Sequence, residues 1–273
     1  FAEDVLRRCA SDAARSLSLR RAYVTFVSNA AYVPGGLALA NSLRQSGSRD
    51  WPFVVVITDE LPRDSLNTIQ RALPTAQFIT VTPLRSRHNV SLVRPYLRSA
   101  FTKLQLFSLT QYDVLLYLDA DTVVLRPIDD LFDTVTDGFH LLAAGAGAPF
   151  INSGLMVLRP HNALFAALLR MLEEGSYVHP FADQALIGQL LRPRTRLLPC
   201  ADHVINLLWN NIRGDFGCPA SADERVTLSQ VRVMHWVSTP KPFARFSVRQ
   251  LFLYSHIYQL YREHLRAARR TSG

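Results

Sequence analysis

The chain has few cysteines and no long hydrophobic segment. Its 273 residues include three cysteines, Cys9, Cys200 and Cys218. This number is small and odd, which argues against a disulfide framework and favours a reducing compartment. No apolar run approaches the roughly 18 residues that a membrane-spanning helix needs, so we expect no membrane span in this chain. We therefore expect a cytoplasmic protein. Because residue 1 is Phe rather than Met, the alternative is a protein of the Golgi lumen whose membrane anchor has been removed.

The glycine-rich motifs of the commonest nucleotide-binding folds are also absent. The chain has no Gly-x-Gly-x-x-Gly after its first predicted strand and no Walker-type lysine, which argues against dinucleotide-binding and P-loop proteins. The formal net charge is +8. The basic residues are not interleaved with aromatic residues, as they are in proteins that bind single-stranded nucleic acid. We therefore expect an anionic ligand and no nucleic-acid partner.

What the chain does contain is an alternation of strands and helices. Strands are predicted at 23–27, 53–57 and 78–81, with helices at 34–45 and 62–73 between them. This order is typical of an α/β fold whose mostly parallel sheet has right-handed crossovers. Later helices are predicted at 101–111, at 127–132, after a capping Asn162, and along a C-terminal apolar stripe formed by Leu251, Tyr254, Tyr258, Tyr261 and Leu265.

No repeat or low-complexity linker divides the chain. We predict a leader helix or N-terminal extension at 1–21, one domain at 22–265 and a basic tail at 266–273. A homodimer through the leader or the C-terminal helix is one option.

Two carboxylates, Asp119 and Asp121, interrupt a run of strand-forming residues. The five apolar residues at 114–118 are typical of a strand that is buried on both faces. Buried carboxylates are costly unless they are paired or bind a metal, and ligands of open α/β sheets bind beyond the carboxyl ends of the strands. The pattern predicts a divalent cation held for a substrate phosphate, with an acidic turn as the alternative.

Other candidate residues are scattered along the chain. Small and polar residues at 152–154 separate two apolar runs, which indicates close backbone approach or ligand contact. Asp183 begins a predicted helix, where capping and a functional role are both consistent with its position. His235 ends a predicted strand, where a lone histidine is more often a core residue, but Lys241 follows it closely. Lys103 faces either solvent or the site.

Seven ordered motifs resemble those of the glycogenin-like glycosyltransferases, family 8 of the glycosyltransferases, over roughly residues 22–262. The motifs are Ala22-Tyr23-Val24-Thr25 with Asn29 and Tyr32, Arg94-Pro95 with Thr102-Lys103-Leu104, the segment 117–122, the segment 129–132, the segment 150–154, Asp183-Gln184, and His235-Trp236 with Lys241-Pro242.

The resemblance implies a GT-A fold, which is a Rossmann-like, mixed but mostly parallel sheet flanked by helices. It also implies the retaining transfer of glucose or galactose from UDP-glucose or UDP-galactose. Mn²⁺ would be held by Asp119, Asp121 and His235, a mixture of ligands that suits Mn²⁺ better than Mg²⁺. The catalytic residues would be Asp183, Lys103 and Asn152. The residues that would bind the donor are Phe26, Ser28, Asn29, Tyr32, Arg94, Ala120, Gln184, Ser238 and Lys241.

The acceptor half of the chain departs from the family pattern. The segment 209–216 has no Tyr, and Arg213 lies near the place where glycogenins carry the tyrosine that they glucosylate. Pro180 stands in place of an acidic residue, and Ser238 in place of a glycine. We therefore expect a separate glycan or glycoprotein acceptor, attacked on the face that the leaving group vacates. The alternatives are a self-glucosylating enzyme and a non-catalytic protein that binds nucleotide sugars.

Overall fold

The computed structural model describes residues 19–49, 51–86, 95–135, 141–145, 151–177, 182–210, 213, 215–218, 221–244 and 248–270. Most of the predicted leader, Arg94 and Pro180 lie outside these ranges. Within the described part of the chain, no helix is both long and apolar enough to cross a membrane.

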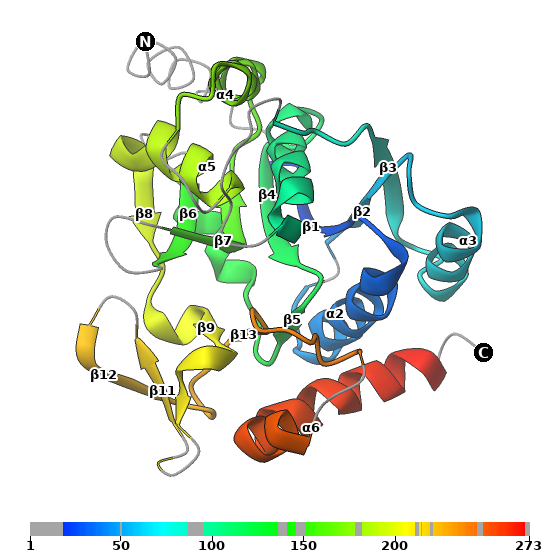
Figure 1. Cartoon of the computed structure of the whole chain (residues 1–273), viewed down its shortest axis with the longest axis vertical. Coiled ribbons are helices and arrows are strands. Elements are labelled where there is room, and N and C mark those ends of the chain that lie inside the picture. The colour runs from blue at the N-terminus through cyan, green and yellow to red at the C-terminus, as the bar shows by residue number, and fades with distance from the viewer. Residues whose placement is uncertain are drawn as a thin grey trace.

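A seven-stranded mixed sheet forms the centre of the structure (Figure 1). Its strands follow the order β3 (Gln77–Val81), β2 (Phe53–Thr58), β1 (Arg21–Val27), β4 (Val114–Asp119), β7 (Ile151–Leu158), β6 (Leu141–Gly145) and β8 (Thr195–Leu197). The first four are parallel to one another, β7 is antiparallel to both of its neighbours, and β6 is parallel to β8. The predicted mixed, mostly parallel sheet is confirmed.

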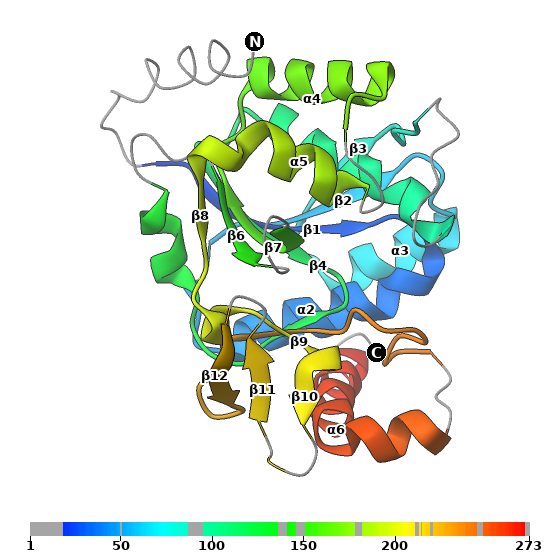
Figure 2. The same ribbon diagram turned by 60° about the vertical axis from the view of Figure 1, so that its left-hand side comes forward.

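Helices cover both faces of this sheet (Figure 2). One face packs against α2 (Val33–Gln45) and α3 (Arg63–Ala72), and the other against η2 (Pro95–Ser108), α4 (Asn162–Glu174) and α5 (Asp183–Leu191). The long C-terminal helix α6 (Val248–Arg270) packs on α2. Tyr261 and Leu265 of its predicted stripe are buried, so the stripe packs as expected where its side chains are described.

Strand β4 is buried on both faces, as its run of apolar residues predicts. Leu115 and Tyr117 pack in the cluster under η2, α4 and α5, whereas Leu116 and Leu118 pack in the cluster on the opposite face. All four are almost completely buried. Full burial of one such leucine contributes about 1.5–3 kcal/mol, so β4 is held firmly up to Asp119 at its carboxyl end.

The predicted helix at 101–111 differs in type and position. The structure has the 3₁₀ helix η2, which ends at Ser108. Phe101, Leu104 and Phe107 are spaced by three residues and all are fully buried. A helix with three residues per turn places them on one ridge against the sheet, which explains the tighter winding.

Two smaller sheets lie beside the main one. The first joins β5 (Thr122–Val124), β13 (Val233–His235) and β9 (Val204–Ile205), and the second joins β10 (Trp209–Asn210), β11 (Asp215–Cys218) and β12 (Ser221–Thr227). Short 3₁₀ helices occur at η1 (Ala30–Tyr32), η3 (Asp129–Thr134), η4 (Arg192–Arg194), η5 (Cys200–Asp202) and η6 (Asn206–Leu208). The sheet of β5, β13 and β9 continues directly from the Asp-x-Asp segment.

The prediction that Asn162 caps its helix is wrong by one residue. His161 is the N-cap of α4, and its Nδ1 accepts a hydrogen bond of 3.1 Å from the backbone N–H of Ala163. The helix ends at Glu174, and the φ of 69° at the following Gly175 is the left-handed conformation common after helices.

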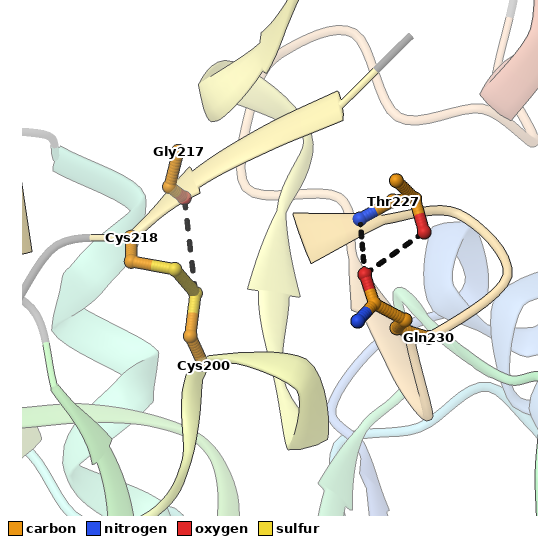
Figure 3. Close-up of a disulfide and its surroundings, with 5 residues drawn as sticks. All are labelled: Cys200, Gly217, Cys218, Thr227 and Gln230. Carbon is orange, nitrogen blue, oxygen red and sulfur yellow. Dashed lines mark hydrogen bonds between the residues drawn. A yellow bond between two sulfur atoms is a disulfide. The ribbon is translucent and has the colours of Figure 1, made fainter. Parts of the chain in front are cut away.

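The cysteine count argues against a disulfide framework, but it misses one disulfide. Cys200 in η5 and Cys218 in β11 are joined by a disulfide (Figure 3). Nearby, the side chain of Gln230 accepts a 3.0 Å hydrogen bond from the backbone N–H of Thr227, which closes the turn after β12. The disulfide links the sheet of β10, β11 and β12 to the segment that leads into β9, and a count of three cysteines cannot reveal one such pair.

Reducing this disulfide should destabilise the protein. The two cysteines are separated by 18 residues in the sequence. For a loop of this length, loss of the disulfide should lower the free energy of unfolding by about 3 kcal/mol. The melting temperature of the wild type should therefore fall when a reductant is added, whereas that of a Cys200→Ser/Cys218→Ser variant should not change. Titration of all three thiols in denaturant without a reductant would show that the bond is absent.

Candidate active site

Two carboxylates and one imidazole converge at the carboxyl end of β4. Asp119 ends this strand, and Asp121 precedes β5. Antiparallel pairing of β13 with β5 sets His235 opposite Thr122. As a result, His235 Nε2 lies 3.1 Å from Asp121 Oδ1 and 3.6 Å from Asp119 Oδ2. Strand pairing thus explains how residues far apart in the sequence form one group.

This group fits a divalent cation. Its candidate ligand atoms lie within 4.8 Å of one another. Asp121 Oδ1 is buried and accepts no hydrogen bond from the described residues, although His235 Nε2 is close. Buried carboxylate oxygens are almost always satisfied, so an orphaned one among other ligands is the environment that a cation would complete. Carboxylate and imidazole ligands suit Mn²⁺ and other transition ions.

Among the described residues, Lys241 has the cation closest to this group. Its Nζ lies 2.6 Å from Asp121 Oδ2 and donates a 2.8 Å hydrogen bond to the backbone carbonyl of Trp236. Burial alone would raise the pKa of Asp121, but Lys241 and His235 outweigh it and hold that pKa below its usual range. Asp121 is therefore ionised at neutral pH.

A second buried charge cluster adjoins the first. Lys103 Nζ lies 2.9 Å from Asp119 Oδ1 and 3.3 Å from Asp183 Oδ2, and it donates a 2.9 Å hydrogen bond to Ser153 Oγ. Lys103 thus faces the site and not the solvent. Burial works to lower the pKa of Lys103, but the two aspartates outweigh burial and raise it.

Asp183 is a member of this cluster and not a helix cap. The N-cap of α5 is Ala182, at φ 48°, which makes no capping bond through its side chain. Asp183 is buried, and its Oδ2 accepts a 2.6 Å hydrogen bond from Ser153 Oγ. Burial raises the pKa of Asp183, and the attraction of Lys103 does not cancel this effect. One lysine is thus shared between two carboxyl groups.

The segment 152–154 makes the close backbone approach that its sequence predicts. The Asn152 side chain accepts a 2.8 Å hydrogen bond from the backbone N–H of Gly154, and Gln184 accepts a 3.0 Å bond from that of Ser153. A Cβ atom on Gly154 would lie 2.2 Å from His235 Cε1. Only glycine leaves room there for the imidazole.

Gly154→Ala should therefore displace His235. We expect a loss of stability of about 1–3 kcal/mol, measured by thermal unfolding, and weaker binding of a divalent cation, measured with Mn²⁺ as the probe by electron paramagnetic resonance of free Mn²⁺. Gly188→Ala in α5 is the matched control, since its Cβ would lie at an ordinary 3.4 Å from Ile151 Cγ1. Equal Mn²⁺ affinity of the Gly154→Ala variant and the wild type would contradict this reasoning.

The residues that follow β1 lie at the same edge of the sheet. Phe26 is paired in register with Asp119. Asn29 caps η1 by accepting a 3.0 Å hydrogen bond from the backbone N–H of Ala31, and its Nδ2 donates to Ser28 Oγ at 3.2 Å. Tyr32 packs edge-on against Phe243, with ring centroids 5.7 Å apart. The predicted donor-binding segment thus adjoins the carboxylates.

The Asp-x-Asp turn is packed tightly on its other side. The backbone carbonyl of Ala120 accepts a 3.2 Å hydrogen bond from the buried Tyr261 hydroxyl of α6. A Cβ atom on Gly35 of α2 would lie 2.4 Å from the same oxygen. The sequence identifies Tyr261 only as part of an apolar stripe. No nearby residue in the sequence indicates the hydrogen bond that its hydroxyl donates.

Asn206 is a further contributor that sequence analysis missed. This fully buried residue donates a 2.7 Å hydrogen bond to Ser238 Oγ and accepts one of 2.9 Å from the backbone N–H of Val237. It therefore shapes the loop between His235 and Lys241. Its only sequence signal is a polar residue within an otherwise apolar segment, which many loops share.

Comparisons with known proteins agree with this geometry. Residues 23–152 match the family model described as Glycosyl transferase family 8. Glycogenin-1 of Caenorhabditis elegans is 30% identical over 228 residues, which are 82% of this chain and 51% of that protein. UDP-glucuronate:xylan alpha-glucuronosyltransferase 1 of Arabidopsis thaliana is 35% identical over 158 residues, which are 57% of this chain and 22% of that protein.

A solved structure of galactosyltransferase LgtC, in complex with donor and acceptor sugar analogs, has the same fold. It superposes with a TM-score of 0.64 at 17% sequence identity and covers 90% of this chain and 95% of its own. The fold is thus that of the GT-A glycosyltransferases, and over the matched residues the chain is similar to the glycogenin-like glycosyltransferases of family 8. It spans about half or less of the length of the two curated relatives.

Proposed function

We propose that this chain is a retaining, metal-dependent glycosyltransferase that moves glucose or galactose from a UDP-sugar to a separate acceptor. The observation that carries the proposal is the adjacency of two buried clusters at one edge of the sheet. One cluster holds the cation ligands Asp119, Asp121 and His235. The other holds Lys103 and Asp183, and Asp119 belongs to both.

The first cluster would bind Mn²⁺ together with the donor diphosphate. When bound, such a cation offsets the negative charge that grows on the leaving UDP, which stabilises the transition state more than the ground state. Asp119, Asp121 and His235 would be its protein ligands. Lys241, which lies against Asp121, would place a further positive charge beside the departing phosphate.

The second cluster would orient the sugar. Asn152, Asp183 and Gln184 carry the polar groups for its hydroxyls, and Lys103 holds Asp183 in place. Asp183 accepts from Ser153 and is close to Lys103, so its carboxylate is restrained. This restraint supports attack by the acceptor on the face that UDP vacates, and argues against a covalent intermediate on Asp183. The leaving phosphate would take the proton of the acceptor.

The acceptor side supports a separate glycan. The segment 209–216 contains no tyrosine, and Arg213 is exposed, with its Nε 3.5 Å from Asp215 Oδ2. A guanidinium cannot serve as the hydroxyl nucleophile that self-glucosylation needs. We therefore place a glycan or a protein-linked glycan in the acceptor role.

The disulfide bears on the compartment. Disulfides persist in oxidising compartments and are rare in the cytosol. The Cys200–Cys218 bond therefore supports the alternative that the protein works in the Golgi lumen.

The test is a donor and acceptor screen. The protein is incubated with UDP-glucose, UDP-galactose or UDP-glucuronate, with and without Mn²⁺, and UDP release is measured before products are sought on a glycan array. We expect UDP release with one of the two hexose donors, only when Mn²⁺ is present, and no hexose added to the protein by intact mass. Absence of UDP release with every donor would refute the proposed transferase activity. UDP release with UDP-glucuronate alone would show that the donor is UDP-glucuronate and not a UDP-hexose.

A further inference from the structure

We infer that His203 is a positioning residue for the metal site. Its ring accepts a hydrogen bond from the Nδ1–H of His235, and this bond directs the unprotonated Nε2 of His235 toward the cation. This inference rests on the proposed metal-dependent function. It concerns a residue that lies outside the Asp119, Asp121 and His235 group and that would not itself touch the metal.

Strand pairing brings the two histidines together. Strand β9 pairs in parallel with β13, with Val204 opposite Met234 and Ile205 opposite His235. His203 immediately precedes β9. Its Nε2 lies 3.1 Å from His235 Nδ1, and the ring centroids are 5.2 Å apart. Each histidine is only 5% exposed, so water does not readily replace this contact.

The chemistry of imidazole assigns the direction of this hydrogen bond. A neutral imidazole carries one N–H and one lone pair, so a histidine that binds metal through Nε2 must keep its hydrogen on Nδ1. In His235 this Nδ1–H points to His203 Nε2, which must then be the acceptor. Ligating histidines commonly use such an outer partner, which sets both the ring orientation and the tautomer.

The surroundings of His235 leave few substitutes for this partner. The Cε1 and Nδ1 edge of the ring lies against Gly154, where even a Cβ atom would be 2.3 Å from Nδ1. The opposite nitrogen, Nε2, faces the two aspartates. Without an acceptor at position 203, the buried Nδ1–H would be unsatisfied, or the hydrogen would move to Nε2 and block the lone pair that the cation needs.

The test compares His203→Phe, which keeps a buried ring but removes the acceptor, with His203→Gln, which keeps an acceptor. Mn²⁺ affinity is measured by electron paramagnetic resonance of free Mn²⁺, without donor or turnover. We expect His203→Phe to weaken Mn²⁺ binding about 10- to 100-fold and His203→Gln to stay within roughly threefold of wild type. His264→Phe in α6 is the control for the substitution itself and should leave the affinity unchanged.

Nitrogen-15 NMR of the histidines in the Zn²⁺-loaded wild type provides a second measurement that does not depend on the variants folding. We expect the hydrogen of His235 on Nδ1 and an unprotonated Nε2 on His203. Equal Mn²⁺ affinity of His203→Phe and wild type, or a hydrogen on His203 Nε2, would overturn this inference alone. Absence of Mn²⁺ and Zn²⁺ binding by the wild type would overturn the proposed metal site and this inference with it.

Discussion

Asp121→Asn should lower both the Mn²⁺ affinity and the transferase activity by more than about 100-fold, because it removes a ligand charge while keeping the shape of the side chain. Asp121 is the more deeply buried of the two carboxylates in the metal group, and its two oxygens face His235 and Lys241. An asparagine amide would bring its N–H donors toward these partners. The readouts are the free Mn²⁺ signal and the rate of UDP release.

The same substitution should also destabilise the protein, because Lys241 would lose its carboxylate partner in a largely buried place. Breaking a buried ion pair typically costs about 3–5 kcal/mol. Asp121→Asn/Lys241→Met should recover much of this stability without recovering Mn²⁺ binding, which separates folding from ligation. The control is Asp133→Asn, at an exposed residue paired with Arg21, which should change stability by no more than about 0.5 kcal/mol. An Asp121→Asn variant that binds Mn²⁺ and turns over like the wild type would refute the metal assignment.

The pH dependence of stability follows from the lowered pKa of Asp121. A carboxyl group whose pKa is lower in the folded than in the unfolded state contributes stability above its unfolded pKa, and loses it as the pH falls through the folded pKa. The contribution of Asp121 is therefore complete at neutral pH and is lost only below the usual aspartate range. Asp121→Asn should flatten this acid-side dependence.

Lys103→Met should be the most destabilising single change in the second cluster. It would leave Asp119 and the buried Asp183 facing each other without the cation between them, at a cost of about 3–5 kcal/mol. Activity should fall as well, because Asp183 would no longer be held in position. Denaturant unfolding and UDP release measure the two effects.

The pH dependence of this loss distinguishes charge from packing. Burial already raises the pKa of Asp183, and removal of Lys103 should raise it further. A carboxyl group with a raised folded pKa loses stability as the pH rises through the range between its unfolded and folded pKa values. The loss of unfolding free energy in Lys103→Met should therefore be smaller at pH 5 than at pH 8. Adding Asp183→Asn to the same chain should restore part of that free energy. An equal loss of unfolding free energy at both pH values would indicate that Lys103 contributes through packing alone and not through its charge.

Much of the fold follows from local patterns. The apolar run before Asp119 predicts a strand buried on both faces, and the structure confirms it with Leu115 and Leu116 in clusters on opposite sides. The small residues at 152–154 predict close backbone approach, and Gly154 makes it against His235. These predictions succeed because burial on one strand and the absence of a side chain depend on a few adjacent residues.

Other features needed contacts between distant segments. His235 has the sequence signature of a lone core histidine, and it is buried, yet pairing of β13 with β5 sets it against two carboxylates. The disulfide likewise depends on the packing of two segments against each other. The 3₁₀ winding of η2 depends on the packing of this helix against the sheet.

Local sequence patterns predict an α/β sheet with a strand that ends in an Asp-x-Asp pair, and the order of the motifs resembles that of family 8. No such pattern predicts that Lys103 joins Asp119 to Asp183, that the Tyr261 hydroxyl donates to the Ala120 carbonyl, or that His203 lies against His235. Strand formation depends on neighbouring residues, whereas hydrogen bonds between buried polar groups depend on the register and packing of segments that are remote in the chain.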